Sequence, residues 1–484
     1  MVNLGSFFQT GTSYKKKPVI VVLFLISAII ICAFYLQKKT ARPNILLITI
    51  DALRVDHLGC YGYARNTSPN IDRLAKEGAR FTQAISQSTL TVPSLPSLMT
   101  SLYPSQLGIT TIFQMVPIFA PTLAEILKEN NYHTGAIIAH LLKHTDIKKG
   151  FDSAIFVSPL DYAYTSDKVT KKAIDWIAQN RGRRFFLWLH YMDPHEPFTP
   201  AHPYDEIFLS EKFKKHGREF LTKKYYWVAP PKKPLPSLPP PALKSLPFGL
   251  PSTIQTVSGN LNKEDKEYYI AQYDGEIRFT DAQIGLLLDE LKKLGLNTKT
   301  LIIVSADHGE NLAEYNNYFA HGISLNDNQL KVPLIITYQK LPRNKVIKEQ
   351  VQLIDIMPTI LDISGVKKDI TIEGKSLLPF IFGKEGTAMQ YAFSELFGVV
   401  KSIRTEDWKL IFYLDKNRYE LYNLKSDPDE RNNLAESKSE KSESLKKELN
   451  DWVERIRQSG SRPPSGRELT EDIKAKLRSL GYAQ

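Results

Sequence analysis

The chain has 484 residues, of which 42% are hydrophobic and 24% charged, a composition that excludes wholesale disorder and allows one large and one smaller domain. The formal net charge of +11 is compatible with nucleic acid, an anionic membrane surface or an anionic substrate as a partner. The sequence contains no zinc-finger spacing, arginine-rich helix or RNA-binding aromatic pattern, so we expect no nucleic-acid partner. Two cysteines, Cys32 and Cys60, are too few for a disulfide framework.

Near the N-terminus, residues 18–36 form an apolar run without a charge, preceded by a basic segment, 1–17. At about 1.5 Å per residue, a helix of this length just spans a hydrocarbon core of roughly 30 Å. We therefore predict a transmembrane signal anchor at 18–36 and a single-pass protein of the cell membrane. A cleaved signal peptide is the alternative.

Further along the chain, continuous apolar runs predict strands that are buried on both faces of a mostly parallel sheet. The expected strands are 44–50, 133–139, 185–191, 300–305 and 332–337. Between and after them, helix-starting residues and apolar periodicity predict helices at 68–78, 94–101, 121–130, 262–294 and 353–364. The fold class is therefore α/β, with a large mostly parallel sheet flanked by helices.

Two further segments complete the predicted organisation. Residues 229–252 are dense in proline, which excludes a helix or a central strand and predicts an exposed insertion. After residue 390, short alternating segments and a helix at 436–457 predict a small antiparallel sheet with a helix. We expect a catalytic domain at 43–385 and a C-terminal subdomain at 386–484.

Polar residues follow three of the predicted strands. They are Asp51, the segment from Asp193 to His195, and the pair Asp307 and His308. Because parallel strands bring their carboxyl ends to the same edge of a sheet, these side chains can converge there. Asp51, Asp307 and His308 are a plausible set of ligands for a divalent metal, and they favour zinc or manganese over calcium. A purely structural metal is the alternative.

A candidate nucleophile, Thr91, stands just before the predicted helix 94–101. A hydroxyl there is close to the positive end of the helix, and a neighbouring metal could deprotonate it. By itself such a threonine is usually a helix N-cap. Because Asp51, Asp307 and His308 are predicted to bind a metal nearby, we predict that Thr91 is the nucleophile and a further metal ligand.

Eight segments, in order along the chain, resemble the sulfatase branch of the alkaline-phosphatase superfamily. The resemblance covers nearly the whole chain after residue 42 and implies the alkaline-phosphatase-like fold. It also implies that the catalytic domain lies on the extracytoplasmic side of the membrane. The segments are 42–63, 67–81, 91–104, 191–198, 273–296, 305–322, 404–411 and 420–435.

The chain departs from the family pattern at the nucleophile motif and the metal loops. Sulfatases that use formylglycine begin this motif with Cys or Ser, whereas Thr91 stands here, so no formylglycine can form. Leu95 replaces the family's arginine, Ala52 replaces the second aspartate, and His308 stands where many sulfatases have Asn. These features resemble the phosphoethanolamine and glycerol-phosphate transferases of the superfamily. Those enzymes use a threonine, one zinc or manganese ion, and a histidine placed as His321 is here.

The residues and the resemblance together predict a membrane-anchored, metal-dependent hydrolase of sulfate or phosphate esters that forms a covalent Thr91 ester. His195 and His321 are expected to stabilise the transferring group or to protonate the leaving oxygen, and with His202 to bind the substrate. The expected cofactor is one divalent ion, Zn, Mn or Ca, and the expected substrate is a sulfated or phosphorylated glycan or lipid. The alternatives are a transferase that moves a phospho-headgroup to a surface glycan or lipid, and an inactive scaffold.

Overall fold

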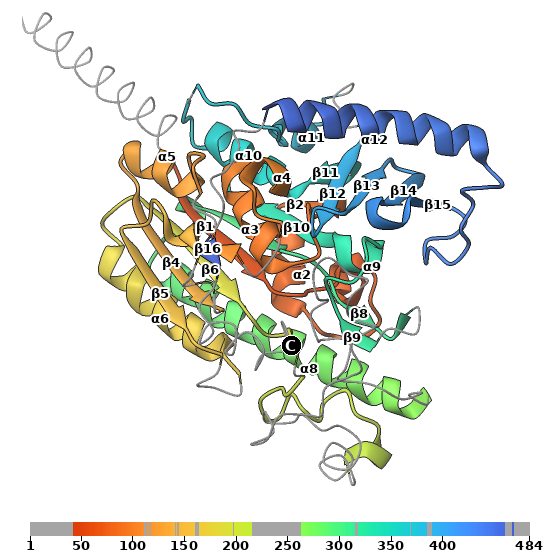
Figure 1. The fold of residues 1–484 in the computed structure, drawn as a ribbon. Helices are drawn as coiled ribbons and strands as arrows, with labels where there is room; N and C mark the ends of the chain where they lie inside the picture. Colours follow the sequence, from red (N-terminus) through yellow and green to blue (C-terminus); the bar gives the residue numbers. More distant parts are fainter. Residues whose placement is uncertain are drawn as a thin grey trace, which may run out of the picture. The chain divides into compact units, whose positions relative to one another are not determined.

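The computed structural model of the chain is shown in Figure 1. It describes residues 42–484 apart from 111–113, 116–117, 141, 143–144, 160–163, 197, 215–262, 315–317, 368, 385–389, 460–466 and 469–484. The predicted proline-rich insertion at 229–252 and the basic segment 1–17 lie outside the described residues.

The prediction of a membrane-anchored location is corrected. Across the described part of the chain, no helix combines the length and the apolarity that crossing a bilayer requires. The segment 18–36, on which that prediction depended, lies outside the described residues.

One large sheet organises the described chain. Its strands are β1 Asn44–Ile50, β2 Ala79–Ile85, β4 His133–Ala139, β5 Ser153–Val157, β6 Phe185–Tyr191, β7 Thr300–Ala306, β10 Lys331–Thr337 and β11 Lys345–Gln352. They form an 8-stranded sheet in the order β11-β2-β10-β7-β1-β6-β4-β5, in which β10 alone runs antiparallel to its neighbours. The predicted mostly parallel sheet is confirmed.

The three central strands are the most apolar. Every residue of β1, β6 and β7 is buried, as expected for strands that are covered on both faces. β1 lies between β6 and β7 and is parallel to both, pairing Ile50 with Tyr191 on one side and with Ala306 on the other. The carboxyl ends of all three strands therefore meet at one edge of the sheet.

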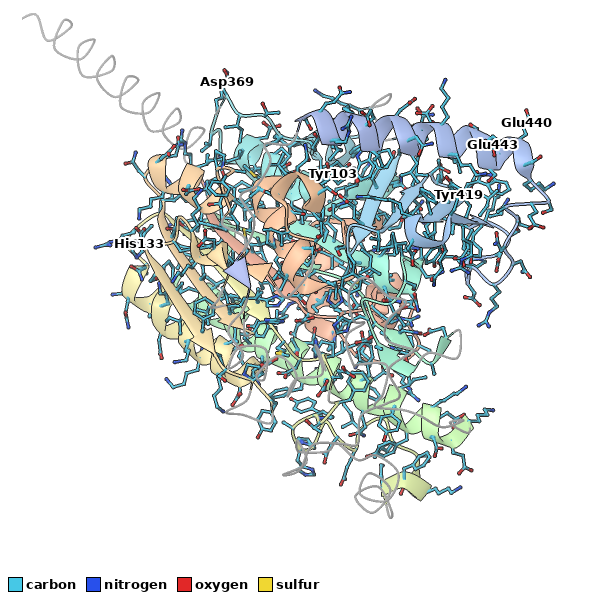
Figure 2. All side chains as sticks on the ribbon, viewed as in Figure 1. Tyr103, His133, Asp369, Tyr419, Glu440 and Glu443 are labelled. Atoms are coloured by element: carbon cyan, nitrogen blue, oxygen red, sulfur yellow. The ribbon has the colours of Figure 1, made fainter. Side chains whose placement is uncertain are left out.

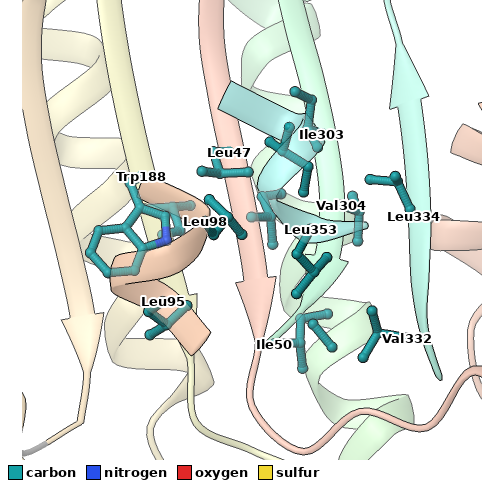
Figure 3. Close-up of a cluster of buried hydrophobic side chains, with 14 of the residues drawn as sticks. Leu47, Ile50, Leu95, Leu98, Trp188, Ile303, Val304, Val332, Leu334 and Leu353 are labelled. Atoms are coloured by element: carbon teal, nitrogen blue, oxygen red, sulfur yellow. The ribbon is translucent and has the colours of Figure 1, made fainter. Parts of the chain in front are cut away.

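Helices cover both faces of this sheet. They are α2 Pro69–Glu77, α3 Thr91–Thr100, α4 Pro104–Leu107, α5 Leu123–Glu129, α6 Ser166–Asn180, α8 Lys263–Lys293, α9 Asp327–Leu330, α10 Ile356–Ile363, α11 Leu378–Ile381 and α12 Ser439–Ser459. The helices α2 and α6 pack with α8, whereas α3 packs with α5 and α10. Figure 3 shows α3 on one side of the central strands, where Leu95 and Leu98 enter the core beside Trp188.

A second, antiparallel sheet follows in the sequence. Its strands are β12 Ala392–Leu396, β13 Val400–Arg404, β14 Trp408–Tyr413 and β15 Arg418–Asn423, paired in that order. α12 covers this sheet through a separate apolar cluster that includes Trp452 and Tyr103 (the latter labelled in Figure 2). The rings of these two residues meet edge to face at 5.0 Å. The predicted small sheet with a helix is confirmed. Four short strands make two further pairs: β3 Gln114–Met115 with β16 Arg467–Glu468, and β8 Asn311–Leu312 with β9 Tyr318–Ala320.

The predicted helix 94–101 begins earlier than expected. α3 starts at Thr91, and its N-cap is Leu90, which makes no side-chain capping bond. Thr91 is therefore inside the first turn, not a residue that precedes the helix. Pro93 lies at the third helical position, where its missing N–H costs nothing because the first N–H groups of a helix have no partner in the helix.

Candidate active site

Two strand ends bring the predicted metal set together. Asp51 follows β1 directly, and Asp307 and His308 follow the neighbouring strand β7. One ligand atom from each of these three side chains lies within 4.8 Å of the other two, and all three residues are buried. Ala52 adopts a left-handed conformation (φ 53°), and its N–H donates to Oδ1 of Asp307 at 3.3 Å. The turn after β1 thus holds the two metal loops against each other.

The donor atoms of this cluster fit a cation. Nδ1 of His308 lies 2.8 Å from the carbonyl oxygen of Gly309, which can only accept, so Nδ1 carries a proton, and Nε2 is bare in the neutral ring, the form in which His308 would ligate a metal. That bare nitrogen lies 3.6 Å from Oδ1 of Asp51 and 3.5 Å from Oδ2 of Asp307. A lone pair that faces two carboxylates is unfavourable unless a positive charge lies between them. A backbone carbonyl on the far side of the ring is the usual partner of a metal-binding histidine.

The two carboxylates have opposite pKa shifts. Burial and the neighbouring charge of Asp307 raise the pKa of Asp51. Burial acts in the same direction on Asp307, but the adjacent His308 and His190 hold the pKa of Asp307 below its usual value. Three carboxylate oxygens receive no well-formed hydrogen bond from any described residue. They are Oδ1 and Oδ2 of Asp51 and Oδ2 of Asp307. Buried carboxylate oxygens without donors are costly, and a bound cation would compensate for that cost.

Thr91 lies at the edge of this cluster. Its hydroxyl oxygen lies 3.2 Å from Nε2 of His308, to which it can donate because that nitrogen is bare. Two serine hydroxyls fix the start of α3 in this place: Ser86 and Ser94 both donate to the backbone carbonyl of Asp307, Ser94 at 2.7 Å. The nucleophile motif and the metal loop are therefore tied together by hydrogen bonds that do not involve Thr91 itself.

A second group of side chains adjoins the metal set. The ring of His321 stacks on that of His308 with centroids 4.4 Å apart and meets that of His195 edge to face at 4.8 Å. Burial alone would lower the pKa of His321, but the Glu310 carboxylate, 3.0 Å from Nδ1, raises that pKa to about 9. His321 is therefore a buried imidazolium at neutral pH. Burial and the charge of His321 lower the pKa of His195 well below its usual value, so His195 is neutral.

Two other predicted residues lie outside this cluster. The side chain of His202 is 70% exposed and pairs with Asp205 at 3.1 Å, so its role in substrate binding stays a prediction. Asp193 accepts hydrogen bonds from the backbone of Thr165 and Ser166 at the start of α6. Asp193 therefore fixes the loop that carries His195.

The structure gives roles to further residues outside the predicted catalytic, metal and substrate-binding set. Glu310 belongs to the same loop as Asp307 and His308, and only its contact with His321 reveals a role. Arg54 is buried and binds Asp56 at 2.6 Å together with Glu314, which locks the two metal loops on their outer side. Burial raises the pKa of Glu196 to about 8, and this carboxyl is near the charges of Glu310 and His321.

Comparison with protein families agrees with this geometry. The family model described as Sulfatase matches residues 43–366, which include every predicted site residue. A second model, described as N-sulphoglucosamine sulphohydrolase, C-terminal, matches residues 317–459 and so covers the antiparallel sheet and all of α12.

Curated proteins and solved structures give the same result. The chain is 25% identical to an N-acetylglucosamine-6-O-sulfatase of Bacteroides thetaiotaomicron, over 83% of this chain and 84% of that protein. It is 27% identical to a sulfatase of Formosa agariphila, over 82% and 84%. The phosphonate monoester hydrolase of Agrobacterium radiobacter shares the fold, with a TM-score of 0.68 and 21% identity over 89% of this chain and 99% of that one. A protein solved with its substrate D-glucosamine-2-N,6-O-disulfate has a TM-score of 0.67 and 22% identity over 87% and 99%.

The sulfatase model spans the whole segment from β1 through α10, and the relatives match over most of their length. The two solved structures share the fold over most of this chain. This chain belongs to the sulfatase family of ester hydrolases, within the alkaline-phosphatase superfamily.

Proposed function

We propose that the protein is a metal-dependent hydrolase of sulfate esters that uses Thr91 as a covalent nucleophile. The observation that carries this proposal is the contact of 3.2 Å between the Thr91 hydroxyl and Nε2 of His308, beside a buried cluster of metal-ligating atoms. A hydroxyl without an activating neighbour is a weak nucleophile, and this one has three candidate metal ligands around it.

The cation would be held by Asp51, Asp307 and His308, with Thr91 adjoining. A divalent ion bound there would lower the pKa of the neighbouring hydroxyl and neutralise negative charge on an ester oxygen. Two carboxylates and one imidazole are a donor set that zinc and manganese accept. The neutral His308 ring, fixed by Gly309, is already in the tautomer that such a ligand needs.

In the first step, the Thr91 oxygen attacks sulfur in line, and the bond from sulfur to the leaving oxygen breaks. A covalent Thr91 ester remains, and the alcohol departs. His321 is suited to protonate the departing oxygen because it is buried, charged and oriented by Glu310. In the second step, the now neutral His321 takes a proton from the water that attacks the same sulfur, the threonine oxygen leaves as the alkoxide, and inorganic sulfate is released.

Sulfate esters are the first candidates for the substrate because the curated relatives are sulfatases. Two relatives carry names that specify sugar substrates, an N-acetylglucosamine-6-O-sulfatase and a delta 4,5-hexuronate-2-O-sulfatase, so a sulfated glycan is the proposed class. Phosphate and phosphonate monoesters are the second candidates. They have the same tetrahedral centre, and a phosphonate monoester hydrolase shares the fold.

The test compares the purified full-length chain with Thr91→Ala, each with zinc, manganese or calcium. The substrates are nitrophenyl sulfate, nitrophenyl phosphate, the phosphonate monoester nitrophenyl phenylphosphonate, and a 6-O-sulfated glucosamine. We expect the substitution to lower kcat by about a thousandfold or more, because it removes the attacking oxygen. Rapidly quenched wild-type enzyme should also carry one sulfuryl group on the peptide that contains Thr91, detectable by mass spectrometry.

Thr100→Ala is the matched control. It makes the same change at the other end of α3, where the Thr100 hydroxyl donates only to the backbone carbonyl of Pro96 at 2.7 Å. This variant should keep the wild-type rate. Unchanged turnover in Thr91→Ala would remove Thr91 from the mechanism, and turnover of the phosphonate or phosphate alone would replace sulfate by phosphorus chemistry.

A further inference from the structure

His190 is a buried side chain that the proposed reaction does not use. It lies on β6 opposite Thr49 of β1, and side chains alternate along a strand, so His190 shares one face of the sheet with Thr49 and Asp51. His190 is fully buried, and its Nε2 atom has no well-formed hydrogen bond within the described chain. A buried ring nitrogen of this kind requires an explanation.

The contacts of His190 determine which nitrogen carries its proton. Nε1 of Trp188 donates to the Thr49 hydroxyl oxygen at 2.9 Å, since an indole nitrogen can only donate. The single proton of Thr49 is then available for Nδ1 of His190 at 2.9 Å or for the carbonyl of Leu189 at 3.3 Å. The ring nitrogen is the nearer acceptor, and accepting there leaves the proton of the neutral ring on Nε2.

That proton faces a metal ligand. Nε2 of His190 lies 3.4 Å from Oδ2 of Asp51, whereas Oδ1 of the same carboxylate lies 3.6 Å from Nε2 of His308. The two oxygens of Asp51 thus face different partners. With the opposite tautomer, a lone pair of His190 would face the carboxylate and repel it.

We propose that His190 is a positioning residue for Asp51. Its Nε2–H holds Oδ2, so that Oδ1 is directed toward the cation, and Thr49 and Trp188 fix the ring that does this. Outer hydrogen bonds of this kind orient metal-ligating carboxylates and histidines, and their loss typically weakens metal binding about 10- to 100-fold. The proposal rests on the metal site of the proposed function.

The experiment measures metal affinity. The full-length chain is stripped with a chelator and titrated with zinc or manganese in a calorimeter, as wild type and as His190→Leu and His190→Gln. We expect one ion per wild-type chain and about 10- to 100-fold weaker binding in His190→Leu. Both variants remove the imidazole ring, but only Gln keeps an N–H that can reach Oδ2 of Asp51. His190→Gln should therefore bind the metal nearly as tightly as wild type.

Two further variants test whether a loss of affinity comes from the position of the His190 proton or from a general effect on the fold. Thr49→Val keeps the shape of the side chain but removes the hydroxyl that sets the tautomer, and it should weaken binding in the same direction. His133→Gln is the control, since His133 (Figure 2) begins β4 at the amino-terminal end of the strand, away from the cluster. Its ring stacks on Trp176 there. Its metal affinity should equal that of wild type.

The outcomes separate the two proposals. If the wild-type chain binds no ion, the metal-dependent function fails, and the role of His190 fails with it. Suppose that wild type binds one ion. If both His190 variants bind it with the wild-type affinity, or if both lose the same amount of affinity, the N–H of His190 has no positioning role and the ring only fills space. Two ions per wild-type chain, one of which is lost in His190→Leu, would make His190 a direct ligand and would overturn the positioning role.

Discussion

The role of Thr91 comes from its surroundings and not from its residue type. Ser86 and Ser94 anchor the start of α3 to the carbonyl of Asp307, and this brings the Thr91 hydroxyl to the bare nitrogen of His308. A threonine at the first turn of a helix is ordinary. Here the same position is within reach of three side chains that can ligate a metal, which makes its hydroxyl a candidate nucleophile.

Glu276 of α8 gives a stability prediction at the level of one side chain. Burial, together with the charge of Asp193, raises the pKa of Glu276 well above its usual value. The folded state therefore holds a proton that the unfolded chain has released, so the stabilising contribution of this carboxyl is greatest below about pH 4.5 and is lost as the pH rises. Glu276→Gln should remove that loss and still accept the hydrogen bond from the Thr199 N–H, which is 2.7 Å long in the native protein.

We expect the Glu276→Gln variant to have a higher melting temperature than wild type at pH 8, by about 2 °C or more, and a smaller change between pH 5 and pH 8. Differential scanning calorimetry at both pH values measures this. The exposed residue Glu443 of α12 supplies the control, since Glu443→Gln should leave the pH dependence unchanged (Figure 2). A melting temperature that falls equally at both pH values would show that Glu276 is charged in the folded protein.

At this scale, the sequence predicted the metal set but only part of its surroundings. Asp51, Asp307 and His308 could be predicted because each follows an apolar run, and parallel strands place such residues at one edge. Glu310 and His190 could not, because their roles depend on contacts with residues that are distant in the sequence. The sequence favoured His195 over His202 because His195 directly follows a predicted strand, but it could not show that the His202 side chain is exposed.

Among the elements, α3 buries the leucine that stands where the resemblance places the family's arginine. Leu95, at that position, is fully buried in the core beside Trp188 and Leu98 (Figure 3). An arginine there would place a guanidinium among apolar side chains without a partner. Leu95→Arg should therefore lower the free energy of unfolding by about 3–5 kcal/mol.

Urea unfolding followed by circular dichroism measures the effect of Leu95→Arg. Leu95→Met is the matched control because it conserves volume and should cost less than about 1.5 kcal/mol. If Leu95→Arg were as stable as Leu95→Met, the side chain at this position would have access to the site, and the core packing of α3 would not account for the loss of the arginine.

The elements that the sequence missed share a physical property. β5 and β11 form the two edges of the large sheet and are only partly buried, so they lack the continuous apolar run that identified β1, β6 and β7. β2 is interior but has several half-buried polar residues. The central strands could be predicted because burial on both faces restricts their residues, and this restriction weakens toward the edges.

In the whole molecule, a buried ionic network joins the two sheets. Nζ of Lys409 on β14 lies 2.7 Å from Asp327 of α9 and 2.7 Å from Glu430, and Lys409 is fully buried. Arg404 of β13 binds the same Asp327 at 2.9 Å. Lys409→Met would leave two buried carboxylates with one cation fewer, and we expect a loss of about 3–5 kcal/mol in the free energy of unfolding.

Limited proteolysis together with thermal unfolding checks the Lys409→Met prediction. In Lys409→Met, the antiparallel sheet β12–β15 should become accessible to protease at a lower temperature than in wild type, since the ionic network holds that sheet to the large sheet. Lys171→Met is the control because Lys171 pairs with Asp175 on an exposed helix face, where an ion pair contributes at most about 1 kcal/mol. Equal stability of the two variants would mean that apolar contacts alone join the sheets.

The order of strands in the large sheet has a consequence for how the protein is made. β1 is the first strand of the described chain, yet both of its partners, β6 and β7, come much later in the sequence. Asp51 leaves the ribosome about 250 residues before Asp307, which at roughly 5–20 residues per second is an interval of about 10–50 seconds. Throughout that interval the nascent chain carries the nucleophile motif and one carboxylate without the rest of the cluster. The proposed cation could therefore be bound only after most of the polypeptide has been synthesised, and a chain that terminates before β7 would carry Asp51 and Thr91 without Asp307 and His308.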